Sequence, residues 1–371
     1  MRNRADGPRV DGVRAGPARV DGRLANPELP MNAEPAEALG LVKDEPAAQW
    51  RVEWATGSQV GPRARHVPSG HTDEVRGVAT TVVSDCPIAV TSSRDDTVRL
   101  WDLATGQQFG EPLTGHDDMV LAVATAVVDG RPVAVSGGGD ETVRVWDLTT
   151  GQQVGKPLTG DHDPVLAVAT AVVEGRPVAV TSGGGTHGLV RAWDLTTHRQ
   201  LGEPLTGHRG EVHALATTEV AGRPTAITSG EDESVRVWDL ITRREIGNPL
   251  TGHDKDALAV ASIAVDGRPH AITSGLDWTV RLWDLATRRQ VGKPLIGHRG
   301  PVTACTGAVI DGCPTAVTGG MDRTVRVWDL NTSEQAGPEL TFPLPVGAVT
   351  MSSGGRLVVG FGQEVAVLSR R

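Results

Sequence analysis

Short runs in which apolar residues alternate with small or polar ones follow one another along most of the chain. The clearest set begins with Val120–Val128, where branched and small side chains alternate, and continues with Val133–Ser136 and Thr142–Trp146. A weaker fourth run covers Gln153–Pro157. Alternation with a period of two is typical of β-strands, because successive side chains point to opposite faces of a sheet. No window keeps a helical period over about ten residues, so the pattern predicts an all-β fold.

Turn-forming residues separate these runs. Asp129-Gly130 suits a two-residue hairpin, the Gly/Asp cluster Gly137–Asp140 turns the chain again, and Thr150-Gly151 precedes the fourth run. Gly and Asp tolerate the left-handed backbone that such turns need. Each unit is therefore predicted to be a sheet of four short strands.

The unit repeats six times at an almost constant interval of about 45 residues. A Trp-Asp dipeptide ends the third run of every unit, and a Gly-His pair precedes it at constant spacing in five of them. The tryptophans are Trp101, Trp146, Trp193, Trp238, Trp283 and Trp328, and the histidines are His71, His116, His208, His253 and His298.

A single four-stranded sheet with two apolar faces cannot bury either face alone. Stacking such sheets radially around an axis lets each one cover its neighbour, which is the architecture of a β-propeller. The six full repeats, each predicted to form one blade, cover 70–114, 115–159, 160–206, 207–251, 252–296 and 297–341.

The residues on either side of the six repeats predict one further blade. Three strands are expected after the last repeat, and Ala55–Pro62 copies the fourth-strand segment that follows each Trp-Asp. One N-terminal strand and three C-terminal strands, drawn from 55–69 and 342–371, would close the ring and remove open sheet edges. We therefore predict a seven-bladed β-propeller over residues 49–371.

Residues 1–48 differ from the rest of the chain. They are rich in Pro, Gly, Ala and Arg and show no periodicity, so they are predicted to be a disordered tail. Met31 is an alternative start site to Met1.

Composition and charge exclude several classes of function. The 36 Lys and Arg against 45 Asp and Glu give a net charge of -9, which disfavours nucleic-acid binding. No apolar run is long enough to span a membrane, and the N-terminus lacks the apolar segment of a signal peptide. The three cysteines, Cys86, Cys305 and Cys313, lack metal-site spacing. We expect a soluble, cytoplasmic protein without a cofactor or bound metal.

The Gly-His and Trp-Asp units resemble those of the WD-repeat family of seven-bladed β-propellers over about residues 54–371. Their Arg-rich, Lys-poor sequences are similar to bacterial, especially actinobacterial, WD repeats. The resemblance implies a structural tetrad of Trp, Ser or Thr, His and Asp in a blade. The sets are Trp101, Thr91, His71, Asp95; Trp146, Ser136, His116, Asp140; Trp238, Thr228, His208, Asp232; Trp283, Thr273, His253, Asp277; and Trp328, Thr318, His298, Asp322.

A hydroxyl, an imidazole and a carboxylate also occur together in hydrolase triads. A catalytic site need occur only once, whereas these residue types recur in five repeats. In the tetrad, moreover, every hydroxyl is bound to an indole. We therefore interpret the sets as buried structural networks and predict that the protein is not an enzyme.

Two repeats depart from the pattern. In the third, Gly160-Asp161-His162 replaces Gly-His, the turn before Trp193 is longer, and His187 stands where the tetrad Asp is expected. Its Gly183–Gly185 segment either admits a ligand or partner close to the backbone or is a tolerated insertion. In the seventh blade, Leu368-Ser369 stands in place of Trp-Asp, so no tetrad is predicted there.

The resemblance implies that partners bind the upper face, which carries the turns before the first and third strands of each blade. There Trp278 replaces a charged residue, and Leu276 and Met321 are apolar. Trp278 either anchors a partner or folds onto its own blade. The predicted partner site is Leu276, Trp278, Met321, Arg94, Lys255 and Arg299.

The sequence thus favours a monomeric, non-catalytic scaffold that binds a protein or peptide on its upper face. The alternative is that the central channel binds a small molecule or catalyses a reaction. Its polar candidates are Arg76, His213 and Thr303, which replace leucines of other repeats on the innermost strands.

Overall fold

The computed structural model describes residues 50–57, 65–67, 70–160 and 163–370, all of which belong to the compact unit Ala38–Arg371. The predicted disordered tail, residues 1–48, lies outside the described residues. Within the described ranges the secondary structure consists of β-strands and turns, arranged in seven sheets. In this part of the chain there is no helix with the length and hydropathy needed to cross a bilayer.

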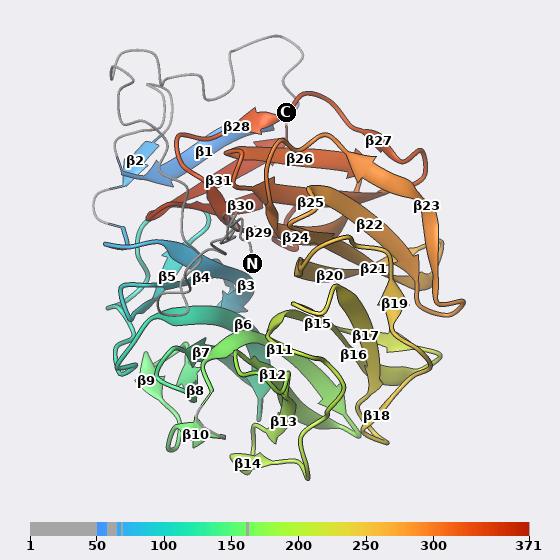
Figure 1. Cartoon of the computed structure of the whole chain (residues 1–371). Coiled ribbons are helices and arrows are strands. Elements are labelled where there is room, and N and C mark those ends of the chain that lie inside the picture. Colours follow the sequence, from blue (N-terminus) through green and yellow to red (C-terminus); the bar gives the residue numbers. More distant parts are fainter. Residues whose placement is uncertain (1–49, 58–64, 68–69, 161–162, 371) are drawn as a thin grey trace, which may run out of the picture. The chain divides into compact units, whose positions relative to one another are not determined.

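Six of the sheets follow the six repeats, one sheet to a repeat, and are numbered here as blades 1 to 6 (Figure 1). Blade 1 contains β3 (Val75–Val83), β4 (Cys86–Ser93) and β5 (Val98–Asp102), and blade 2 contains β6 (Val120–Val128), β7 (Arg131–Gly138), β8 (Thr142–Asp147), β9 (Gln152–Gln153) and β10 (Leu158–Thr159). Blade 3 contains β11 (Val165–Val173), β12 (Arg176–Gly183), β13 (Val190–Asp194) and β14 (Arg199–Gln200), and blade 4 contains β15 (Val212–Val220), β16 (Arg223–Gly230), β17 (Ser234–Asp239), β18 (Arg244–Glu245) and β19 (Leu250–Thr251). Blade 5 contains β20 (Ala257–Val265), β21 (Arg268–Gly275), β22 (Thr279–Asp284) and β23 (Arg289–Ile296), and blade 6 contains β24 (Val302–Ile310), β25 (Cys313–Gly320), β26 (Thr324–Asp329), β27 (Glu334–Gln335) and β28 (Leu340–Thr341).

The seventh sheet joins the two ends of the described chain. Its strand order is β2-β1-β31-β30-β29, from β2 (Arg65–Val67) and β1 (Trp50–Thr56) to β31 (Glu364–Arg370), β30 (Leu357–Phe361) and β29 (Val346–Met351). Figure 1 shows the blue β1 beside the red β31. The first strands of all seven blades lie innermost, each packs on the next, and β29 packs on β3. The predicted all-β, seven-bladed propeller is confirmed, and the ring is closed.

The N-terminal strand differs from the prediction in its bounds. The copied segment Ala55–Pro62 predicts a strand after Gly57, whereas β1 runs from Trp50 to Thr56 and pairs antiparallel with β31. In blade 1 the same triplet, Ala104-Thr105-Gly106, forms the turn after the third strand, and the other full repeats also turn at this place. In the seventh blade the third strand is β31, at the other end of the chain, so Ala55 and Thr56 continue a strand instead. The Thr56 hydroxyl accepts the backbone N–H of Val365 at 2.9 Å.

Packing between blades buries the repeated tryptophans. Trp146 of blade 2, for example, lies in one cluster with Val90, Val98 and Leu113 of blade 1. A buried Trp removes on the order of 200 Å² from water, which at about 25 cal/mol per Å² contributes up to roughly 5 kcal/mol. Each blade is therefore stabilised mainly by its neighbours, as the stacking argument predicts.

The innermost strands are also joined by side-chain hydrogen bonds. Thr125 Oγ1 donates to the Thr80 carbonyl at 3.2 Å, and Thr170 Oγ1 donates to the Thr125 carbonyl at 2.7 Å. Thr217 and Ser262 extend the series into blades 4 and 5, at 2.6 and 2.9 Å. Blade 6 carries Gly307 at the equivalent position, where a Cβ would lie 2.7 Å from Ile263 Cβ, so this series ends there.

Candidate functional site

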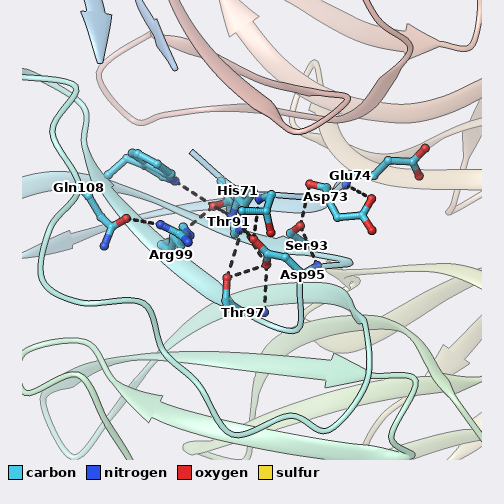
Figure 2. A network of polar contacts seen from close by, with 11 residues as sticks. His71, Asp73, Glu74, Thr91, Ser93, Asp95, Thr97, Arg99 and Gln108 are labelled. Carbon is cyan, nitrogen blue, oxygen red and sulfur yellow. Dashed lines mark hydrogen bonds and ion pairs between the residues drawn. The ribbon is translucent and has the colours of Figure 1, made fainter. Parts of the chain in front are cut away.

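The predicted tetrad of blade 1 is assembled in the interior (Figure 2). The indole N–H of Trp101 donates to Thr91 Oγ1 at 2.9 Å, and Thr91 Oγ1 lies 2.7 Å from His71 Nε2. His71 Nδ1 lies 2.9 Å from the carboxylate of Asp95, which also accepts the backbone N–H of Thr72. With Asp95 ionised, His71 carries its proton on Nδ1, so the Thr91 hydroxyl donates to Nε2 while it accepts from the indole.

Four further blades repeat this geometry, and the structure brings together every set of four residues that the resemblance implies. The imidazole–hydroxyl distances are 2.7 Å for His116–Ser136, 2.7 Å for His208–Thr228, 2.8 Å for His253–Thr273 and 2.8 Å for His298–Thr318. The indole N–H bonds of Trp146, Trp238, Trp283 and Trp328 are each 2.8 Å. The imidazole–carboxylate contacts of Asp140, Asp232, Asp277 and Asp322 run from 2.8 to 3.0 Å.

The tetrads fix the protonation of their members. Burial alone would raise the pKa of Asp277, but the hydrogen bond and charge of His253 outweigh it and lower the pKa to about 2. The pKa of Asp95 is lowered for the same reasons by His71. Burial in turn lowers the pKa of His71, which favours the neutral imidazole. At neutral pH the carboxylates of Asp95 and Asp277 are therefore ionised, and the His71 imidazole is neutral.

The tetrad hydroxyls are enclosed and fully bonded. Thr91, Ser136, Thr228, Thr273 and Thr318 have no exposed surface, and each accepts an indole N–H while it contacts an imidazole. A nucleophile must reach its substrate, and these oxygens do not reach the surface. The geometry is that of a structural network.

Blade 3 contains the indole–hydroxyl half of a tetrad. Trp193 donates to Thr181 Oγ1 at 2.9 Å, while His162 lies outside the described residues. The longer turn of this repeat packs against blade 4: the Thr186 carbonyl accepts the Gly210 N–H at 3.2 Å. Gly188 has a φ of 55°, and a Cβ there would lie 2.6 Å from His208 Cβ. The extra residues thus fill space beside the blade 4 tetrad.

The upper face has the same backbone framework in all seven blades. In each blade, the N–H of a residue in the turn before the third strand donates to the carbonyl of a residue in the loop before the first strand. The pairs are Arg94–Glu74, Gly139–Met119, Gly184–Pro164, Glu231–Glu211, Leu276–Asp256, Met321–Pro301 and Gly362–Pro345, at 2.8 to 3.1 Å. The side chains on this framework differ from blade to blade, and blade 3 also has a longer turn.

Trp278 occupies a left-handed turn position on this face. Its φ is 64°, its N–H donates to the Gly275 carbonyl, and the residue is 49% exposed. The equivalent residues adopt nearly the same backbone with charged side chains: Asp96, Glu141, Glu233 and Arg323, with φ from 60° to 65°. A bulky non-glycine residue is rarely found in this conformation. The turn therefore fixes the backbone, and in blade 5 it presents an indole at the surface.

Three apolar residues accompany Trp278 on blades 5 and 6. Met321 is 42% exposed, Leu276 is partly buried, and Ile296 is 77% exposed. Ile296 pairs with Thr279, the residue that follows Trp278. We call Leu276, Trp278, Ile296 and Met321 the blade 5–6 patch. Sequence reasoning missed Ile296, although a signal was present: the other repeats carry Thr at its position, namely Thr114, Thr159, Thr206, Thr251 and Thr341.

The three predicted basic residues are not all near this patch. Lys255 and Arg299 are exposed on the loops that lead into the first strands of blades 5 and 6. Arg94 instead belongs to blade 1, which blade 7 separates from blade 6, and its guanidinium lies 3.2 Å from Glu74. Arg94 is therefore removed from the predicted partner site, because ring closure places blade 7 between the two.

The polar candidates for a channel site lie on separate blades and have partners of their own. Arg76 of blade 1 is 3.9 Å from Glu74, and His213 of blade 4 lies between Glu211 and Asp256. The Thr303 hydroxyl of blade 6 donates to the Val346 carbonyl at 2.7 Å.

The three cysteines are unpaired. Burial raises the pKa of the Cys305 thiol to about 12, so it remains protonated and unreactive. In the described ranges no group of three His, Cys, Asp or Glu residues is arranged to hold a metal ion.

Seven sheets in a closed ring, with tetrads inside five of them, define a β-propeller of the WD-repeat class. The family WD domain, G-beta repeat matches residues 63–102, 107–147, 199–239, 244–284 and 289–329, more than half of the chain. The chain therefore belongs to this family. No curated protein matches the chain at a significant level. Propellers of this family commonly serve as scaffolds for protein interactions.

Proposed function

We propose that the protein is a non-catalytic scaffold whose blade 5–6 patch binds a protein or peptide partner. The observation that carries the proposal is Trp278, a half-exposed indole held in a left-handed turn. That backbone costs a non-glycine residue about 1–2 kcal/mol. The charged residues at this position in other blades form the same turn, so the fold does not need an aromatic side chain there. Binding energy of a partner is a physical reason for it.

The surroundings of Trp278 suit a protein interface. Ile296 and Met321 add exposed apolar surface, and Lys255 and Arg299 provide a charged rim. Interfaces combine an apolar centre, which excludes water, with a polar margin. An indole on a fixed turn also loses little conformational entropy when a partner binds.

Three features support the proposed non-catalytic role, cellular location and oligomeric state. The tetrad hydroxyls are buried, which favours a binding role over catalysis. The unpaired cysteines are in keeping with a reducing compartment such as the cytoplasm. All seven blades are completed within one chain, which favours a monomer. The Arg-rich, Lys-poor repeats favour a bacterial origin.

The test begins with partners captured by the wild-type protein from a lysate of the native cell. Glu is the residue that blades 2 and 4 carry at the position of Trp278, so the Trp278→Glu variant keeps a side chain that the turn accepts. With the captured partner purified, we expect the variant to bind about thirtyfold more weakly, a loss of about 2 kcal/mol.

The matched control is Asp96→Ala, a substitution of the equivalent turn residue in blade 1. It should leave the affinity unchanged. Equal binding of the purified partner by wild type and Trp278→Glu would contradict the proposed site.

A further inference from the structure

Blades 1 and 4 carry different charges on the same upper-face framework. Glu74 and Glu211 occupy equivalent positions, and in each blade the carbonyl accepts the N–H of the turn residue at 3.0 and 2.9 Å. That turn residue is Arg94 in blade 1 and Glu231 in blade 4. Two residues after each glutamate stand Arg76 and His213. The chain therefore contains an internal comparison for this position.

In blade 1 the carboxylate is neutralised by the chain itself. Arg94 Nη1 lies 3.2 Å from Glu74 Oε2, and Arg76 Nη1 lies 3.9 Å from the same oxygen. The contact shows that a guanidinium fits beside a glutamate at this position of the framework.

In blade 4, Glu231 and His213 stand at the positions of Arg94 and Arg76, so neither guanidinium is present. Glu231 Oε2 accepts the Glu211 N–H at 3.3 Å, and Asp256 of blade 5 lies 3.8 Å from His213. Among the described residues, no Lys or Arg lies within ion-pair distance of Glu211, Glu231 or Asp256. His213 is 3.9 Å from Glu211, and its buried Nε2 has no hydrogen-bond partner.

The pKa of Glu211 is raised in this cluster of carboxylates. Burial raises the pKa of Glu211, and the charges of Glu231 and Asp256 raise it further, against the opposing effect of His213. Carboxylates held together in this way attract a cation more strongly than isolated ones, because the cation relieves their mutual repulsion.

These carboxylates adjoin the blade 5–6 patch. The Asp256 carbonyl accepts the Leu276 N–H at 2.9 Å, and Leu276 is two residues before Trp278. A series of hydrogen bonds and close charged contacts thus runs from Glu231 through Glu211, His213 and Asp256 to Leu276 of the apolar patch.

We infer that the partner is a polypeptide segment that carries an arginine or lysine next to a bulky apolar side chain. The cation binds between Glu211, Glu231 and Asp256, in the place that Arg94 fills in blade 1, and the apolar side chain packs on Trp278. This inference rests on the proposed function and adds the chemistry of the partner to it.

The first experiment selects binders from a displayed library of random linear peptides on the full-length protein. We expect wild type to enrich peptides in which Arg or Lys stands close to Trp, Phe, Leu or Met. The Glu211→Gln/Glu231→Gln variant should lose the preference for Arg and Lys but keep the apolar preference. Selected peptides without a basic residue, or identical selections on both proteins, would overturn the inference.

The second experiment measures the affinity of one selected peptide for single variants. Glu231→Arg gives blade 4 the residue of blade 1 and should weaken binding at least about tenfold, with an affinity that no longer falls as salt is added. The reverse exchange in blade 1, Arg94→Glu, is the matched control and should leave the affinity unchanged. An unchanged affinity in Glu231→Arg would refute the cation site.

The Trp278→Glu variant separates the two proposals. If the peptide binds this variant as well as wild type, the proposed function fails, and the inference fails with it. If Trp278→Glu weakens binding but the glutamate variants do not, the proposed function stands and only the partner chemistry is wrong. Unfolding curves of every variant check that the fold is kept.

Discussion

The interior of the blades and their upper face come from the same repeat. The residues of the interior are nearly constant from blade to blade, whereas those of the upper face vary. In five blades the tetrad residues keep the same types, except that Ser136 replaces Thr in blade 2, and the imidazole–hydroxyl distance stays at 2.7 or 2.8 Å. On the upper face the backbone hydrogen bonds are equally regular, yet one turn position carries five different residue types. These are Arg94, Gly139, Glu231, Leu276 and Met321.

The difference has a simple physical origin. A buried donor or acceptor that loses its partner costs about 1–3 kcal/mol, so a tetrad residue that is replaced by one without the same hydrogen-bonding group reduces the stability. A side chain on an exposed turn has no such constraint, provided that it tolerates the backbone. The interior therefore maintains the fold, and side chains of the upper face can change to bind a partner without loss of stability.

The strongest way to break this comparison is to remove one tetrad hydroxyl. Thr273→Val leaves the Trp283 indole N–H and the His253 Nε2 without a partner in the interior. We expect a loss of about 3 kcal/mol in the free energy of unfolding, measured by urea denaturation. Thr273→Ser should be tolerated, because Ser136 fills the same role in blade 2. A loss below about 1 kcal/mol in the valine variant would show that the tetrad contributes little.

The longer turn of blade 3, which packs against blade 4, can be tested by a substitution at Gly188. Gly188→Ala places a Cβ against His208 and forces a non-glycine residue to a φ of 55°. We expect a loss of about 2 kcal/mol in stability, seen in the same denaturation experiment. Gly130→Ala is a useful contrast, since it also has a positive φ but meets no atom within 4 Å. Equal losses in the two variants would mean that the contact with blade 4 does not matter.

The pH dependence of stability follows from the lowered pKa of Asp277. Because the folded pKa of about 2 lies below the ordinary value of 3.8, the stabilisation is present above about pH 4 and is lost as the pH falls toward 2. Asp277→Asn has no carboxyl to titrate, so its free energy of unfolding should fall less steeply over this range. Parallel curves for the variant and wild type would contradict the assignment.

A smaller effect is expected from the bonds between innermost strands. Thr217→Val removes the hydrogen bond to the Thr170 carbonyl and should cost about 1 kcal/mol in thermal or chemical unfolding. Ser262→Ala removes the next bond of the series and should cost a similar amount. No change in either variant would show that these bonds are replaced by water without loss.

The ring could be predicted from the sequence because it depends on repetition. The tetrads were predicted from the resemblance to the WD-repeat family, and the constant spacing of the repeats then assigned residues such as Asp232 and Thr228 to them. The bounds of β1 were missed because Ala-Thr-Gly is a turn in blade 1, whereas Ala55 and Thr56 belong to a strand in the closing blade. The sequence of one repeat predicts its local structure, but which strand β1 pairs with depends on how the whole ring closes.

The candidate site was predicted only in part for a related reason. Trp278 and Met321 stand out as departures from the repeat, and Ile296 could have been found in the same way. Arg94 was placed near them because its repeat position is equivalent, whereas the blades themselves are apart. The carboxylates of Glu211 and Asp256 belong to different blades, and only the ring geometry brings them to one surface.

The central claim is that recognition resides in the blade 5–6 patch and stability in the interior. The most direct test is titration calorimetry of a purified partner against Trp278→Glu, with unfolding of the same variant measured in parallel. We predict about thirtyfold weaker binding and a change in unfolding free energy below about 1 kcal/mol. Unchanged binding, or a loss of binding that follows only from a loss of folding, would contradict the claim.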